Sequence, residues 1–194
     1  MNDLNVARIK GDRLNLCLLM DDSNSISTYV KWANDEDLIW RLGFNQGSIS
    51  RQEIEQWATK ERDSNDIIFS LVTRADNTLI GLVRLKRTRF SSTGRLEIFI
   101  GEPDYLGRSY GTETLYSILK FAFEECCYHR IEALIVEDDV RAVKSFSKVG
   151  FRLSGIFNED YWAQGKWHNV VNMEILYDDW IDLQERIRGF KYVA

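Results

Sequence analysis

The stretch YLGRSYGTETLYSILKFAFEE, residues 105–125, joins a glycine-containing loop directly to a strongly periodic apolar segment. The apolar side chains recur at spacings of three and four residues, at Leu115, Ile118, Leu119, Ala122, Phe123 and Cys126. This spacing predicts a helix with one buried face. Because a loop that leads into a helix brings backbone N–H groups together with the positive end of the helix dipole, the expected ligand at this junction is an anion.

The loop residues favour phosphate or pyrophosphate as that anion. Gly107 and Gly111 allow a close approach to the backbone, Arg108 supplies a positive charge, and Ser109 and Thr112 supply hydroxyl groups. Their spacing matches neither the P-loop nor the dinucleotide-binding fingerprint. On these residues alone, a loop that needs glycine only for its own geometry is the alternative.

Strand-like and helical segments follow one another on both sides of this stretch. Before it we expect a strand at 13–20, helices at 23–35 and 50–63, and strands at 66–74, 78–90 and 94–101. After it we expect a strand at 130–138, a short helix between Asp139 and Gly150, a long hairpin that turns at 163–166, and a terminal helix at about 178–190.

The connections predict how these strands pair. Short turns between the strands of 66–101 predict antiparallel hairpins, whereas the strand–helix–strand passage predicts that 94–101 and 130–137 pair in parallel. The expected fold class is therefore α/β (α+β). It has a mixed, mostly antiparallel sheet of six to seven strands with a parallel central pair and flanking helices, in one domain over 1–194.

Composition and charge argue against several classes of protein. Hydrophobic residues make up 44% of the chain, no apolar run approaches the roughly 20 residues of a membrane span, and the N-terminus lacks a signal-peptide pattern. We therefore expect a cytoplasmic protein with no membrane partner. The net charge of −5 argues against nucleic-acid binding. His129 and His168 lack ligand-spaced neighbours, so no metal is expected.

Two stretches carry a resemblance to a known family, namely IFIGEPDYLGRSYGTETL (98–115) and HRIEALIVEDDVRAVKSFSKVGF (129–151). Through them the chain resembles the GCN5-related N-acetyltransferase (GNAT) superfamily, in the branch of ribosomal-protein N-terminal acetyltransferases and spermidine N-acetyltransferases. The resemblance implies the GNAT fold and acetyl-CoA (coenzyme A) as cofactor. It also implies an acceptor that is the primary amine of a small molecule (polyamine, amino sugar or antibiotic) or a peptide N-terminus, and it allows a homodimer.

The same resemblance assigns the cofactor contacts. The family pattern [QR]-x-x-G-x-[GA] wraps the pyrophosphate, and here Leu106, Ser109 and Gly111 fall at its three defined places. Ser109 replaces a glycine, which the loop tolerates if φ of Ser109 is negative. The implied cofactor-binding residues are Phe99, Ile100, Gly101, Leu106, Gly107, Arg108, Ser109, Tyr110, Gly111, Thr112, Asp139 and Phe146.

Besides Ser109, two of these positions depart from the family. Asp139 stands at a usual asparagine and Phe146 at a usual tyrosine, which commonly protonates the departing thiolate. A non-catalytic acyl-CoA-binding or regulatory protein of the same fold is therefore the alternative function, and a protein-interaction module without affinity for coenzyme A is a third. The alternative reading of Phe146 itself is a core residue of its helix.

Acetyl transfer also needs a proton acceptor for the amine and a donor for the thioester oxygen. The resemblance implies a backbone donor within 98–101, and Glu97 on the same strand is the candidate catalytic base. Glu97 could instead face solvent or pair with Arg95 or an arginine of 84–89. The resemblance places the acceptor among Trp32, Asp35, Trp40, Tyr161 and Trp162. Aromatic rings with acidic groups suit a cationic amine, although packing under the hairpin would explain them equally well.

Overall fold

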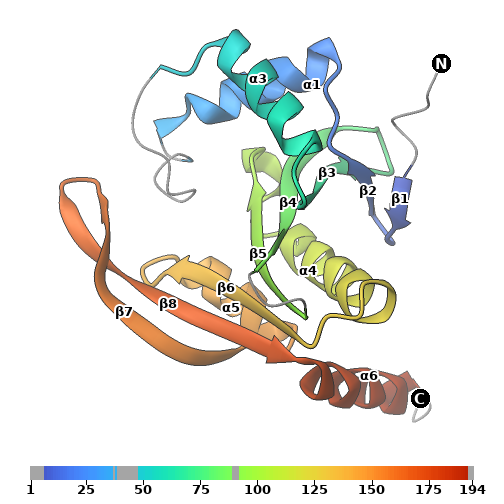
Figure 1. The fold of residues 1–194 in the computed structure, drawn as a ribbon. Helices are drawn as coiled ribbons and strands as arrows, with labels where there is room; N and C mark the ends of the chain where they lie inside the picture. Colours follow the sequence, from blue (N-terminus) through green and yellow to red (C-terminus); the bar gives the residue numbers. More distant parts are fainter. Residues whose placement is uncertain (1–6, 37, 39–47, 89–91, 192–194) are drawn as a thin grey trace.

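The computed structural model describes residues 7–36, 38, 48–88 and 92–191. All the described strands belong to one open β-sheet (Figure 1). The strands are β1 (Ala7–Lys10), β2 (Leu14–Leu18), β3 (Ile67–Thr73), β4 (Leu79–Arg87), β5 (Thr93–Ile100), β6 (Arg130–Val136), β7 (Arg152–Ala163) and β8 (Lys166–Leu176). The helices are α1 (Ser23–Ala33), α3 (Arg51–Arg62), α4 (Tyr110–Lys120), α5 (Val140–Lys148) and α6 (Tyr177–Lys191). A 3-10 turn, η1 (Pro103–Tyr105), precedes α4, and a π-helical turn, η2 (Phe121–Glu125), follows it.

The sheet has eight described strands in the order β1-β2-β3-β4-β5-β6-β8-β7. Its pairs are antiparallel except for β5 and β6, which are parallel as the sequence predicted. The eight strands are one more than the upper end of the expected six to seven. The additional strand is β1, whose four residues pair with β2 through an irregular register and are too few to show an alternating pattern in the sequence.

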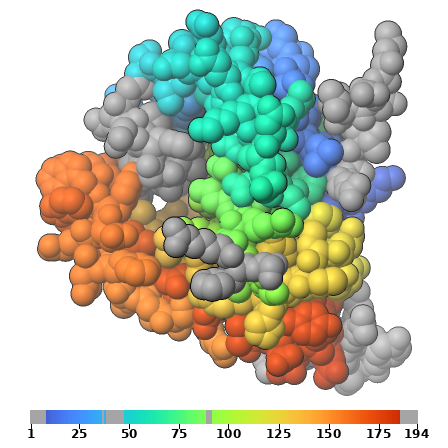
Figure 2. Space-filling view, in the orientation of Figure 1, coloured from blue at the N-terminus to red at the C-terminus, as the bar shows by residue number. Residues whose placement is uncertain are grey.

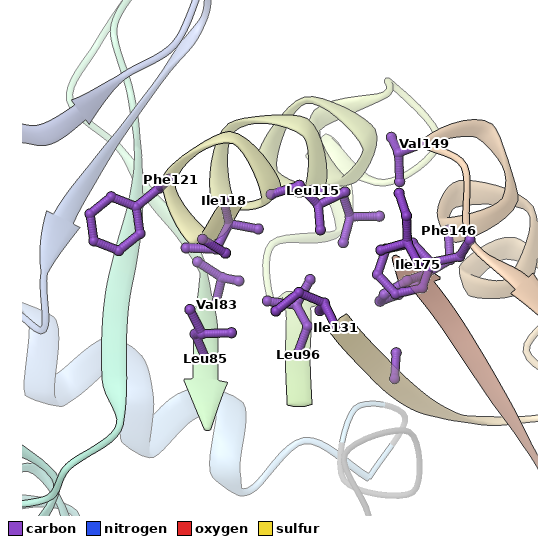
Figure 3. Packing of buried hydrophobic residues seen from close by; sticks show 14 of the residues in the cluster. Val83, Leu85, Leu96, Leu115, Ile118, Phe121, Ile131, Phe146, Val149 and Ile175 are labelled. Atoms are coloured by element: carbon purple, nitrogen blue, oxygen red, sulfur yellow. The ribbon is translucent and has the colours of Figure 1, made fainter. Parts of the chain in front are cut away.

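Helices cover the two faces of the sheet unequally. The α4 helix packs its predicted stripe, including Leu115 and Ile118, on one face of the sheet, where Ile131 of β6 and Ile175 of β8 meet it (Figure 3). On the opposite face, α1 and α3 cover β3 and β4. In Figure 1 these two helices lie at one end of the sheet, and the β7–β8 hairpin extends away at the other. None of the described helices is long and apolar enough to span a membrane.

Side-chain caps begin α1, α3 and α5, whereas α4 begins without one. The Asp22 side chain accepts from the amides of Asn24 and Ser25 to begin α1, and Ser50 begins α3 in a capping box with Glu53. Asp139 begins α5 by accepting from the amide of Ala142. The residue before α4 makes no such side-chain bond, although α4 is among the most completely buried helices of the fold.

Candidate functional site

The strands β5 and β6 part at the centre of the sheet. They pair in parallel only from Thr93 and Arg130 to Arg95 and Glu132, and no further pair joins their described residues. Yet β5 stays paired with β4 as far as Ile100, and β6 stays paired with β8 through its whole length. The parting strands therefore leave a gap in the ladder that an extended ligand could enter.

The backbone groups that face this gap can be identified from the β4–β5 ladder. The amide of Gly101 donates to the carbonyl of Ile80 (2.8 Å), and successive residues of an antiparallel strand direct their backbone groups to opposite sides. The N–H and C=O groups of Ile98 and Ile100 consequently point away from β4 and toward the gap. Of the stretch 98–101 that was expected to supply a donor, Phe99 and Gly101 are excluded because their amides face β4.

The loop that follows β5 turns sharply twice before α4. Gly107 has φ of 73° and Ser109 has φ of 64°, both in the left-handed region. The condition under which serine would replace the family's glycine without strain, a negative φ at Ser109, is therefore not met, and the left-handed conformation costs about 1–2 kcal/mol relative to glycine. The backbone of this loop is bent by its surroundings at a position where the sequence has no glycine.

The start of α4 is open toward the outside. The Glu113 amide donates to the Ser109 carbonyl (3.0 Å) and begins the helical ladder, so the amides of Tyr110, Gly111 and Thr112 lie ahead of it. A Cβ placed on Gly107 or on Gly111 would meet no other heavy atom within 4 Å. This open, donor-rich turn fits the pyrophosphate of a coenzyme, because its amides, its helix dipole and the exposed Arg108 all favour an anion.

Two predicted cofactor contacts serve the protein itself. The carboxylate of Asp139 accepts from the Ala142 amide (3.1 Å) as the cap of α5. The ring of Phe146 is only 4% exposed and packs edge-on against Phe151, with ring centroids 4.9 Å apart (Figure 3). The Phe146 ring therefore has little surface left for a cofactor and packs as a core residue of its helix would.

Trp32, a predicted acceptor residue, lies inside the protein. Its indole is 2% exposed, packs edge-on against Phe99 and donates from Nε1 to Oε1 of Glu102 (2.9 Å), so it has no free surface for an acceptor. A Cβ on Gly101 would lie 2.3 Å from this indole, which explains the glycine there. The Glu102 carboxylate also accepts a hydrogen bond from Nζ of Lys31 (2.9 Å). These contacts of Glu102 with Trp32 and Lys31 could not be predicted from the sequence, because the partners lie about seventy positions apart.

Glu97 lies on the face of the sheet that also carries α1 and α3. Its side chain is 45% exposed and pairs with Lys86, so it faces solvent and its ion-pair partner is a lysine of 84–89 rather than Arg95 or an arginine. The carboxylate of Glu132 on the same face is held differently. Although burial opposes it, hydrogen bonds from Arg95 and Arg130 lower the pKa of Glu132. Of the two, Glu97 is the more accessible carboxylate.

The β7–β8 hairpin directs its two predicted acceptor residues to opposite faces. Tyr161 stands opposite His168, and Trp162 stands opposite Trp167 with ring centroids 5.3 Å apart. Since neighbouring strand residues point to opposite faces, only one of Tyr161 and Trp162 can face an acceptor. By its pairing with His168, Tyr161 shares the face that carries Glu132, and burial raises the pKa of Tyr161.

The other acceptor candidates are at the end of α1. The Asp35 carboxylate accepts from the amide of Leu38 (3.2 Å) and is partly exposed, whereas Trp40 lies outside the described residues. In the space-filling view the orange hairpin and the blue-to-cyan helices stand on either side of the green middle of the chain (Figure 2). Within the described part of the chain, no group of three or more His, Cys, Asp and Glu side chains is arranged to hold a metal ion.

Comparisons with known proteins agree with this geometry. Residues 13–152 match the family model described as an acetyltransferase (GNAT) domain. The chain is 24% identical over 158 residues to a spermidine N(1)-acetyltransferase of Vibrio cholerae, which covers 81% of this chain and 91% of the relative. It is 22% identical over 135 residues to the N-acetyltransferase YnaD of Bacillus subtilis, which covers 70% and 79%.

Solved structures show the same fold. The crystal structure of spermidine N-acetyltransferase from Vibrio cholerae in complex with CoA and spermine superposes with a TM-score of 0.77 at 21% identity, covering 87% of this chain and 98% of that one. A GNAT-family acetyltransferase from Bacillus anthracis gives a TM-score of 0.76 at 19% identity, covering 88% and 98%.

Proposed function

We propose, on the premise that this chain belongs to the GNAT acetyltransferase family, a placement for both of its substrates. As a member of that family it is an N-acetyltransferase that uses acetyl-CoA and transfers the acetyl group to an amine. Acetyl-CoA supplies an acetyl group already activated as a thioester. The chain's own residues then have to hold the coenzyme, orient the amine and remove its proton.

The pyrophosphate belongs at residues 106–112 in this proposal. The observation that carries it is the position of the open α4 start, directly after the strand that parts from β6. An anion held by the first amides of α4 would leave the rest of the coenzyme to run into the gap between the strands. There the backbone groups of Ile98 and Ile100 could pair with its amides as a neighbouring strand would.

The acceptor in this proposal is a small cationic amine that arrives from the side of α1. Two partly exposed carboxylates support it, because Glu97 lies on β5 and Asp35 lies at the end of α1, whereas Glu102 is already held by Lys31 and Trp32. The relative from Vibrio cholerae is named for spermidine, a polyamine, which agrees with such an acceptor. Tyr161 could contribute a ring face to a cation from the hairpin.

Release of free thiol from acetyl-CoA tests this acceptor. We expect a panel of polyamines, aminoglycosides, amino sugars and N-terminal peptides to give the highest kcat/KM with a polyamine. A clear preference for a peptide N-terminus or an amino sugar would overturn the acceptor class. Coenzyme binding without thiol release from any amine would favour the non-catalytic acyl-CoA-binding alternative instead.

Glu97 is the residue that we propose to receive the proton of the amine, since its carboxylate is the accessible one on that face. Glu97→Gln should preserve coenzyme affinity and lower turnover by roughly 100-fold at neutral pH. The deficit should shrink at alkaline pH, where the amine loses its proton unaided. Glu132→Gln is the matched control, because two arginines hold that carboxylate. A Glu97→Gln deficit that stays constant with pH would remove Glu97 from the mechanism.

A second copy of the chain is the partner that we propose for the edge of β7. This edge strand exposes Leu153, Ile156 and Phe157, each with about half of its surface accessible, beside backbone groups that pair with no described strand. Antiparallel pairing of β7 with itself would cover both. Sedimentation equilibrium should give a dimer for the natural chain and a monomer for Phe157→Lys, and a monomeric natural chain would contradict the proposal.

A further inference from the structure

One cluster of contacts near the proposed cofactor loop joins segments that are far apart in the chain. The Glu113 carboxylate, in the first turn of α4, accepts from the amides of Arg13 (2.7 Å) and Leu14 (3.1 Å) at the start of β2. The Arg13 guanidinium returns to the same carboxylate through Nε (2.8 Å). Gly11 makes room for this approach, because a Cβ there would lie 3.0 Å from Oε1 of Glu113.

The same guanidinium also holds the loop itself. Nη1 of Arg13 donates to the carbonyl oxygen of Arg108 (3.0 Å), and Cζ of Arg13 lies 4.3 Å from the ring centroid of Tyr110. Arg108 stands between the two left-handed residues Gly107 and Ser109. A backbone in such a conformation persists only where its surroundings hold it. Arg13 is thus bonded to the middle of the bent segment and packed on the first residue of the helix.

The charges of the cluster matter as well. Glu113 lies within one turn of the amides proposed to bind the pyrophosphate, and a free carboxylate there would repel an anion. Its carboxylate is bonded to Arg13 and Leu14 and its side chain is only 15% exposed, so its negative charge is compensated near the place where the phosphates would lie. Removing Arg13 would both release the loop and uncover this negative charge.

From these contacts we propose that Arg13 and Glu113 are positioning residues that hold the 106–112 loop in its anion-binding conformation. This inference rests on the proposed placement of the pyrophosphate. Arg13 acts through the Arg108 carbonyl and through Glu113, and it is not itself a phosphate ligand. The pair therefore sets the affinity for coenzyme A without taking part in acetyl transfer.

The two possible roles of Arg13 predict opposite effects of Glu113→Gln. As part of a clamp, Arg13→Ala and Glu113→Gln should each raise the Kd for coenzyme A by about tenfold, and the double variant should be little worse than either because the pair works as a unit. If Arg13 instead bound phosphate directly, Glu113→Gln would free it and tighten binding. Tighter binding in Glu113→Gln would overturn the proposal.

A truncated substrate separates positioning of the loop from general damage to the fold. Acetyl-pantetheine lacks the pyrophosphate, so its turnover should be the same in the natural chain, Arg13→Ala and Glu113→Gln. Arg51→Ala is the matched control. Arg51 and Arg13 have similar side-chain exposure (45% and 46%), and each pairs with a glutamate, but Arg51 lies in α3. Equal losses with acetyl-CoA and acetyl-pantetheine would overturn the clamp, and Arg13→Lys, which keeps the charge, should recover part of the affinity.

Calorimetry with coenzyme A on Gly111→Asp distinguishes failure of this inference from failure of the placement beneath it. Unchanged affinity in Gly111→Asp would overturn the placement of the pyrophosphate at the loop. Lost affinity in Gly111→Asp together with unchanged affinity in Arg13→Ala would keep the placement and overturn the clamp alone.

Discussion

The helices α3 and α4 differ in how their first backbone amides are capped. Ser50 closes the start of α3, since its hydroxyl accepts from the Glu53 amide and the Glu53 carboxylate accepts from the Ser50 amide. Ser109 stands at the same place before α4, yet it adopts a left-handed conformation and makes no capping bond. The same residue type thus caps one helix from within and leaves the first amides of the other without a side-chain cap, as the proposed pyrophosphate site requires.

The largest effect should come from filling the open start of α4. Gly111→Asp adds a side chain and a negative charge where a Cβ meets nothing within 4 Å, so the folded chain should accept it and the phosphates should not. We expect the Kd for coenzyme A, measured by calorimetry, to rise at least 100-fold, or about 2.7 kcal/mol.

Gly155→Asp is the matched control for that variant. Gly155 in β7 is likewise open around its Cβ and has no left-handed φ, but it lies far along the chain from the α4 loop. Its variant should bind coenzyme A as the natural chain does. Equal losses of coenzyme A affinity in both variants would show that the added charge weakens binding wherever it lies, and not because it lies at the start of α4.

The next prediction concerns α5, the helix in which Phe146 stands at the family's usual tyrosine. Phe146→Tyr restores the family's usual residue but buries a hydroxyl beside Phe151, so the free energy of unfolding should fall by about 1–3 kcal/mol. Denaturation in urea measures this loss. Turnover should gain less than about tenfold, or 1.4 kcal/mol of barrier. A larger gain would mean that the hydroxyl reaches the thiolate despite the burial of this position.

The smallest effects should come from the two serines themselves. Ser50→Ala removes a cap and should lower the free energy of unfolding by about 1 kcal/mol, whereas Ser109→Ala removes no capping bond and should change it by less than about 0.5 kcal/mol. Thermal unfolding of both variants checks the pair. Equal losses at the two positions would contradict the description of α4 as uncapped.

Much of the fold was predictable because periodicity and turns are local signals. The stripe at Leu115 and Ile118, the start of the short helix at Asp139, and the hairpin turn at 163–166 all lie where the sequence predicts them. These features depend on neighbours within a few residues. The four residues of β1 were missed because so short a strand carries no pattern of its own.

The site was predictable only in part, because a pattern shows residue types and not what each one faces. Trp32 and Phe146 are aromatic residues at plausible positions, but the packed sheet encloses both of them. Ser109 gave no sign of its left-handed φ. The Arg13–Glu113 contact joins residues a hundred positions apart, and only the paired strands and the docked helix bring them together.

The most direct test of the account is to observe the α4 amides while coenzyme A is added. In a ¹⁵N-labelled sample, NMR titration should shift the backbone amides of Tyr110, Gly111 and Thr112 most strongly, together with those of Ile98 and Ile100. The amides at the capped start of α3, residues 51–53, should stay unchanged. Saturable binding that leaves the amide chemical shifts of residues 110–112 unchanged would contradict the claim that the open start of α4 binds the coenzyme.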